Sequence, residues 1–281
     1  MVFCGLCQER HYACRVHPAR TTDPAKDAHV DTSAPQTARI WNYLLGGTDN
    51  FAADRAVGDE ILANLPQLAE NARLSRAYLA RVTRWLTAEV GVRQFLDIGT
   101  GLPTAENTHT VAQSVAPDAR IVYVDHDPLV LAQARALLDS TPEGATAYVH
   151  ADLRDPATIL AEAAKTLDLT RPVALFLMGI LGHVERDDEA KQLIDTYLAA
   201  LPPGSWFAMY DGSDTSPENT EAVRIWNLSA NPKYHLRTPE RIAALFDGLE
   251  LAEPGVVPVT RWRPETDAPA IDQYGAVGRK P

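Results

Sequence analysis

The chain has 281 residues, of which 46% are hydrophobic, so it is long enough to bury the core of one large domain. Its formal net charge is -11, and because the acidic residues are spread along the chain, a nucleic-acid partner is not expected. No apolar run has the length needed to span a bilayer and the N-terminus lacks the apolar stretch of a secretion signal, which predicts a cytoplasmic protein with no membrane partner.

Residues 1–30 show no lasting apolar period, and we expect them to form a flexible N-terminal arm. This arm contains all three cysteines, in the motifs Cys4-x-x-Cys7 and Cys14-x-x-His17. Zn²⁺ accepts such a ligand set, but the spacing between the two pairs is shorter than in common zinc ribbons. We therefore expect no metal site, and metal analysis of the purified protein would decide between the two interpretations.

Residues 31–90 are expected to form a helical N-terminal cap that contributes to a cofactor and substrate cleft. A first helix is predicted from Pro35 to the glycine pair at 46–47, which ends it. A second helix is expected from Asp54 to about Leu65 and a third from Pro66 to Val90, where the apolar residues are spaced to form one buried stripe.

Residues 91–281 alternate short apolar runs with helical stretches, which is typical of a mainly parallel sheet with helices on both faces. One helix is expected from Ala105 to Val115, and another at Pro239 to Phe246 with Thr238 as its N-cap. The sequence thus predicts an α/β, Rossmann-like core with a seven-stranded sheet. The expected strands are Gln94 to Ile98, Arg120 to Val124, Thr146 to His150, Pro172 to Met178, Trp206 to Tyr210, Leu249 to Val259 and Tyr274 to Val277.

The first of these strands ends in an acid and a glycine turn, made of Asp97, Gly99, Thr100 and Gly101. Glycine at 99 and 101 lets the backbone turn sharply and lets a ligand approach where a Cβ would clash. A G-x-G turn after a strand is a weak signal by itself, however, and an ordinary strand-to-helix turn explains it equally well.

Acids also follow the second and third strands. Asp125, beside His126, can accept hydrogen bonds from both hydroxyls of a ribose, whereas Asp127 is expected to cap the helix that follows it. Asp152, followed by Leu153, lies where the amino group of an adenine could be bound. Three acids after three successive strands predict a nucleoside site, and chance surface charge is the alternative.

A nicotinamide dinucleotide is the immediate competitor as the ligand of this site. It requires a helix N-terminus close to its pyrophosphate, usually with a third glycine, and this chain has Thr104 at that position. S-adenosylmethionine has no phosphate, and its amino group and sulfonium are positive. An acid at Asp97 would therefore attract this ligand and would repel a pyrophosphate. The residues favour S-adenosylmethionine as the cofactor.

Taken together, these segments resemble class I S-adenosylmethionine-dependent methyltransferases. More narrowly, the segment from Arg39 to Phe51, together with Asp54-Arg55, resembles the actinobacterial S-adenosyl methyltransferase family, long described only as a domain of unknown function. The likeness extends from about Asp31 to the C-terminus. It implies a methyltransferase acting on a small-molecule specialised metabolite, since some members resemble natural-product enzymes that methylate C3 of the indole in tryptophan-derived cyclic dipeptides. Further matches are 100–104, 140–144 and 246–250.

Two side chains are candidates for catalysis. Many relatives have a Leu-His-Phe-Val-like motif after the fourth strand. This chain has Met-Gly-Ile-Leu-Gly-His-Val at 178–184, so its histidine, His183, is displaced by one residue. Met178 is expected at the cofactor and His183 near the transferred methyl group, where it could take a proton from the acceptor. The alternative for His183 is a structural role, in which it caps the next helix or forms a hydrogen bond with a backbone carbonyl. Tyr43 is expected to orient His183 or the substrate, with simple packing as its alternative.

The acceptor is expected to be an indole or similar aromatic molecule, and a homodimer is left open. The alternatives are O- or N-methylation of another small metabolite and a non-catalytic regulator that binds S-adenosylmethionine. Aromatic walls for the acceptor could come from Trp41, Trp206, Tyr210, Trp226 and Tyr234.

Overall fold

The structure is a computed structural model of the chain, and it describes residues 31–104, 106–130, 133, 140–230 and 232–281. The arm expected at 1–30, with its cysteine and histidine motif, lies outside these residues. Within the described part, no cluster of histidine, cysteine and acidic side chains is placed to hold a metal ion. Nor does that part contain a helix with the length and apolar character needed to cross a membrane.

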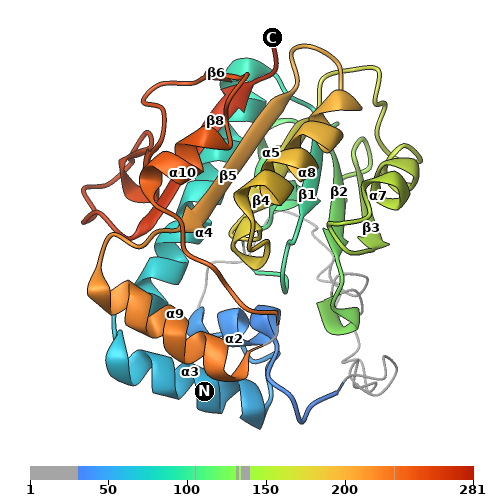
Figure 1. Cartoon of the computed structure of the whole chain (residues 1–281). Coiled ribbons are helices and arrows are strands. Elements are labelled where there is room, and N and C mark those ends of the chain that lie inside the picture. Colours follow the sequence, from blue (N-terminus) through green and yellow to red (C-terminus); the bar gives the residue numbers. More distant parts are fainter. Residues whose placement is uncertain (1–30, 105, 131–132, 134–139, 231) are drawn as a thin grey trace, which may run out of the picture.

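An eight-stranded sheet forms the centre of the described molecule (Figure 1). The strand order is β3-β2-β1-β4-β5-β8-β6, with β7 also paired to β8. Strands β1 to β5 are parallel, and β8 runs antiparallel to β5, so the sheet is mainly parallel as predicted. The strands are β1 Gln94–Ile98, β2 Arg120–Asp125, β3 Ala145–His150, β4 Ala174–Met178, β5 Trp206–Gly212, β6 Glu250–Leu251, β7 Val257–Pro258 and β8 Gln273–Arg279.

The closing part of the sheet differs from the prediction of seven strands. The single strand expected from Leu249 to Val259 is two short strands, β6 and β7, which pair with opposite ends of β8. Pro254 has no N–H for the strand ladder, and Gly255 adopts a φ of +85°, so the chain turns between them and continuous pairing is interrupted.

Both faces of the sheet are covered, which explains the nearly unbroken apolar runs in its central strands. Alternate residues of each strand point to opposite faces. Leu96 belongs to a buried cluster with α7 (Pro156–Ala163) and α8 (Asp187–Ala199). Its neighbour Phe95 belongs to a second cluster with α5 (Thr108–Val115) and with Tyr78 of α4 (Leu68–Trp85).

Helix ends follow the local signals for the most part. Thr238 caps α10 (Pro239–Ala244), since its hydroxyl accepts a hydrogen bond from the backbone N–H of Arg241 at 3.3 Å. The long helix predicted up to Val90 is α4 followed by a π-helical turn, Leu86–Val90, which ends at Gly91 with a φ of +83°.

A third cluster joins the N-terminal helices to a later part of the chain. Helices α2 (Thr37–Leu44) and α3 (Ala52–Asn64) pack with α9 (Pro217–Ser229), and Figure 1 shows the three together at one end of the sheet. Buried Ile40, Ile61 and Trp226 belong to this cluster. The helices that cover this end of the sheet therefore include α9, which the predicted cap at 31–90 did not contain.

Candidate active site

A cavity lies between the carboxyl ends of the parallel strands and helices α2 and α9. Its void volume, counted out to the mouth, is about 1330 Å³. A second void of about 620 Å³ adjoins it. The two voids share the wall residues Gly99, Asp125, His126, Ile180, His183 and Pro232. Small-molecule sites in proteins are usually clefts of this kind, lined mainly by apolar side chains with a few polar groups.

Strand β1 brings Asp97 to the cavity wall. The side chain is only 3% exposed, and its Oδ2 accepts a hydrogen bond of 2.6 Å from the hydroxyl of Thr108. Burial raises the pKa of Asp97 to about 6, and the Thr108 hydroxyl and the charge of Arg76 only partly offset this effect. A cation bound in the cavity would favour the ionised carboxylate.

The glycine bend after β1 has the backbone that the sequence predicted. Gly99 and Gly101 adopt φ values of +77° and +64°, a region that favours glycine. A Cβ on Gly99 would lie 2.6 Å from the side chain of Ile180, so this position also has no room for one. Thr100, between the two glycines, shares a hydrogen bond of 3.1 Å with the hydroxyl of Tyr148.

Asp125, at the end of β2, is hydrogen-bonded to this bend. Its Oδ2 accepts from the backbone N–H of Gly101 at 2.9 Å and its Oδ1 from that of Asp127 at 3.0 Å. Each carboxylate oxygen has a second lone pair that could accept from a ribose hydroxyl. Burial raises the pKa of Asp125. His126 lines the cavity beside it, and Asp127 accepts from the N–H of Leu129 at 2.8 Å, as expected of a helix cap.

The third acid of the predicted set lies at the adjoining void. Asp152 and Leu153 both line this void, together with Asp125, so the strand tips bring the three acids to one connected space. Asp152 is exposed and accepts from the backbone N–H of Arg154 at 2.8 Å, whereas Leu153 is buried and offers an apolar surface. An exposed carboxylate beside an apolar side chain fits one edge and one face of a purine.

Arg76, which the sequence analysis missed, lies in the same wall as Asp97. It projects from α4, and its Nη2 donates to the hydroxyl of Thr104 at 2.7 Å and to Oδ1 of Asn107 at 3.4 Å. A fixed guanidinium in this wall could bind the carboxylate of an amino acid. No motif surrounds Arg76, and a single arginine in an amphipathic helix gives no signal that distinguishes it from a surface residue.

His183 lies in the short turn Leu181–His183 after β4 and lines both voids. Its Nδ1 is 2.7 Å from the backbone oxygen of Lys233, which makes Nδ1 the protonated nitrogen of the neutral ring. Burial to 8% exposure lowers the pKa of His183 to about 4, so the ring is neutral at pH 7. No described residue forms a hydrogen bond with Nε2. Met178, at the end of β4, also lines the cavity.

Tyr43 is not among the described residues that line the cavity, so the predicted position beside His183 and the substrate is corrected. Its hydroxyl donates to Oδ1 of Asp59 on α3 at 2.5 Å, and its ring packs over Gly58, where a Cβ would lie 2.5 Å from a ring carbon. Trp41 and Leu45, one helical turn apart, line the cavity instead. Tyr43 lies midway between them in the sequence and therefore points to the other side of α2.

The cavity has two chemically different halves. We call the wall formed by Arg76, Asp97, the glycine bend at 99–101 and Asp125 the strand-end half, and the wall formed by α2, α9 and residues 232–236 the helical half. Charged Arg, Asp, Glu and Lys side chains among the described lining residues belong only to the strand-end half. The helical half is mainly apolar and aromatic; its lining includes Trp41, Leu45, Ala222, Val223, Trp226 and Tyr234.

The predicted aromatic residues do not all contribute to this cavity. Tyr210 lines it at the end of β5, but Trp206, at the start of the same strand, is absent from its described lining. Trp206 instead packs edge-on against Trp85, with ring centroids 5.3 Å apart.

A mainly parallel sheet with acids and a glycine bend at its strand ends, covered by helices over an apolar half-cavity, defines a class I S-adenosylmethionine-dependent methyltransferase. Residues 23–281 match the model of the S-adenosyl methyltransferase family, and the chain belongs to this family. The resemblance stated from the sequence is thereby confirmed. None of the curated proteins compared with the chain matches it.

Solved structures support this conclusion. A DUF574 family protein from Streptomyces avermitilis is 45% identical, with a TM-score of 0.86, and the match covers 89% of this chain and 99% of that one. A protein from Thermobifida fusca described as a methyltransferase is 42% identical, with a TM-score of 0.83 and coverage of 89% and 96%. The magnesium protoporphyrin IX methyltransferase of Synechocystis, at 12% identity and a TM-score of 0.52 over 86% and 93% of the two chains, shares the fold. The protein is thus a methyltransferase that uses S-adenosylmethionine.

Proposed function

We propose that the enzyme methylates C3 of an indole in a tryptophan-containing cyclic dipeptide of specialised metabolism. The observation that carries this proposal is His183, a neutral imidazole at the cavity with Nε2 unengaged among the described residues. The helical half supports a flat, uncharged acceptor, because Trp41 and Trp226 line it and no Arg, Lys, Asp or Glu does among the described lining residues.

The strand-end half is proposed to hold the cofactor in three parts. Asp97 and the glycine bend at 99–101 would hold the methionine end, with Arg76 on its carboxylate. Asp125 and His126 would bind the ribose. The adenine would lie in the adjoining void, against Asp152 and Leu153, and Met178 would contact the cofactor from β4. When bound, S-adenosylmethionine supplies an electrophilic methyl group.

The protein side chains position the acceptor and remove its proton. The helical half holds the acceptor and excludes water, so that the reacting carbon is kept at attack distance. His183 accepts a proton at Nε2, because Nδ1 is committed to the carbonyl of Lys233. A weak base is sufficient here, since the nitrogen of an indole becomes strongly acidic once C3 has formed a new bond to carbon.

Incubation with labelled methyl donor and a panel of tryptophan cyclic dipeptides tests the acceptor. We expect label in the product, with product NMR placing the methyl group on C3. Transfer to no indole would remove this substrate, and a methyl group on oxygen or nitrogen of another metabolite would establish the alternative reaction.

The role of His183 is tested by His183→Ala, for which we expect kcat to fall by roughly 10²–10⁴ while the Kd for S-adenosylmethionine is unchanged. For the unmodified enzyme, kcat/KM should be independent of His183 ionisation at neutral pH and should fall as the pH drops through about 4, because the protonated ring cannot accept a proton. Full turnover by His183→Ala would exclude this residue as the base.

Other sequence expectations belong to the same proposal. We retain an actinobacterial, cytoplasmic enzyme without a nucleic-acid partner, and a homodimer is left open. Size-exclusion chromatography with light scattering would determine the oligomeric state.

A further inference from the structure

The turn that carries His183 is covered by a later segment, residues 232–237. The backbone N–H of His235 donates to the carbonyl of Gly182 at 2.7 Å. The ring of Tyr234 packs directly on Gly182, where a Cβ would lie 2.2 Å from a ring carbon, and it meets the ring of His183 edge-on at 5.1 Å. The position of His183 therefore depends on this segment.

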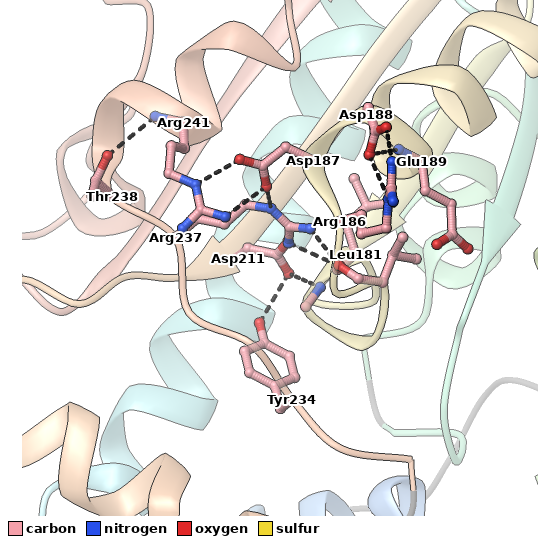
Figure 2. Close-up of polar contacts among 12 residues, drawn as sticks. Leu181, Arg186, Asp187, Asp188, Glu189, Asp211, Tyr234, Arg237, Thr238 and Arg241 are labelled. Carbon is pink, nitrogen blue, oxygen red and sulfur yellow. Dashed lines mark hydrogen bonds and ion pairs between the residues drawn. The ribbon is translucent and has the colours of Figure 1, made fainter.

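A buried arginine ties the two sides of the turn to the same segment. Arg237 is 0% exposed, and its Nη1 donates to the carbonyl of Leu181 at 2.9 Å while Nη2 donates to that of Val184. Its Nε also binds Asp187 at the start of α8, as Figure 2 shows. One guanidinium therefore binds backbone carbonyls on both sides of His183, those of Leu181 and Val184.

Tyr234 is held at both its side chain and its backbone. Its hydroxyl donates to Oδ1 of buried Asp211 at 2.9 Å, a contact drawn in Figure 2, and accepts from the N–H of Gly212 at 3.0 Å. Asn227, on α9, binds both backbone groups of Tyr234. Its Oδ1 accepts from the N–H, and its Nδ2 donates to the carbonyl, each at 2.7 Å.

One peptide group connects Asn227 to His183. The N–H of Tyr234 and the carbonyl of Lys233 belong to the same planar peptide and point in opposite directions. Asn227 accepts from the N–H, while the carbonyl accepts from Nδ1 of His183. If this peptide turned over, an N–H would face the ring and would favour the other tautomer. Hydrogen bonds at both ends of one peptide also strengthen one another.

We propose that Asn227 is a positioning residue that orients the Lys233–Tyr234 peptide and thereby fixes the proton of His183 on Nδ1, leaving Nε2 to accept the proton of the acceptor. This inference rests on the proposed role of His183 as the base. Tyr234 lines the cavity, but its hydroxyl is committed to Asp211 and burial raises its pKa, so it supports the segment and is not a second base.

The experiment is ¹⁵N NMR of the His183 imidazole in the full chain at neutral pH, without acceptor, with His183→Gln used to assign the signals. We expect a protonated Nδ1 and an unprotonated Nε2 in the unmodified enzyme. Asn227→Ala should give a mixture of the two tautomers and lower kcat about tenfold, with the Kd for S-adenosylmethionine unchanged. Asn227→Leu, similar in size but without donor or acceptor, should behave in the same way.

Two further variants sharpen the test. Asn227→Asp loses the donor to the carbonyl of Tyr234 but keeps the acceptor for its N–H, so it should retain the original tautomer more fully than Asn227→Ala. Leu228→Ala, at the next position of α9 and 66% exposed, should change neither the tautomer nor kcat. An unchanged tautomer in both Asn227→Ala and Asn227→Leu, or in the one that folds, would overturn the inference. The tautomer is read without turnover, so this result is independent of whether His183→Ala remains active.

Discussion

The two halves of the cavity differ in how they are built and in what they can bind. In the strand-end half, Asp97 and Asp125 lie at the carboxyl ends of parallel strands, and backbone N–H groups hold Asp125 against the glycine bend. In the helical half, apolar side chains come from α2 and α9, which are separated by most of the core sequence. The first arrangement suits a ligand with positive charge and hydroxyl groups, and the second suits a neutral one. Variants in each half should therefore affect different ligands.

The largest effect is expected for Asp125→Ala in the strand-end half. Hydrogen bonds to a charged group contribute about 1.5–3 kcal/mol each, so loss of two should weaken S-adenosylmethionine binding at least about 100-fold. Calorimetry would measure the Kd, with Asp118→Asn as a control, because Asp118 is an exposed acid paired with Arg93. Unchanged affinity, together with a folded protein by thermal unfolding, would contradict the ribose assignment.

A smaller effect is expected for Arg76→Met, which keeps the length of the side chain and removes its charge. We expect about 10-fold to 100-fold weaker binding of S-adenosylmethionine, corresponding to one charge-assisted pair. The Kd for 5′-methylthioadenosine, which has no carboxylate, should stay the same. Equal losses for both ligands would show that Arg76 supports the fold of the wall and does not bind the carboxylate.

In the helical half, Val223→Lys would place a positive charge beside the proposed neutral acceptor. Because an unpaired charge at an apolar site is costly, we expect KM for the acceptor to rise about tenfold, with little change in the Kd for S-adenosylmethionine. Leu228→Lys, on the exposed side of the same helix, is the matched control. A larger effect on the cofactor than on the acceptor would contradict the division into two halves.

The smallest effect is expected for Tyr43→Phe. The hydroxyl of Tyr43 binds Asp59 outside the described lining of the cavity, so kcat and both binding constants should stay within about twofold of the unmodified values. Steady-state kinetics would measure this, and the melting temperature would report any loss of the contact with Asp59. A large fall in kcat would show that Tyr43 does take part in catalysis.

Much of the strand-end half could be predicted because its signals are local. Strand β1 has the bounds expected from its apolar run, and Gly99 and Gly101 have the positive φ values for which glycine is suited. Asp97 and Asp125 follow directly from their position at strand ends, since parallel strands bring those ends to one edge of the sheet. His183 could be predicted at the cavity for the same reason.

Other features were decided by the tertiary structure alone. The sequence does not indicate that α9 packs on α2 and α3, because an apolar stripe on a helix does not specify its partner. Arg76 and Asn227 have roles only through residues distant in the chain. Tyr43 was misplaced because about half a helical turn separates it from Trp41 and Leu45, which line the cavity, so it lies on the other side of α2. The sequence by itself therefore determined the parallel part of the sheet and the acids at its strand ends, where short-range patterning and backbone geometry are sufficient. The acceptor wall and the hydrogen bonds around His183 depended on long-range packing, which brings together residues that have no local pattern in common.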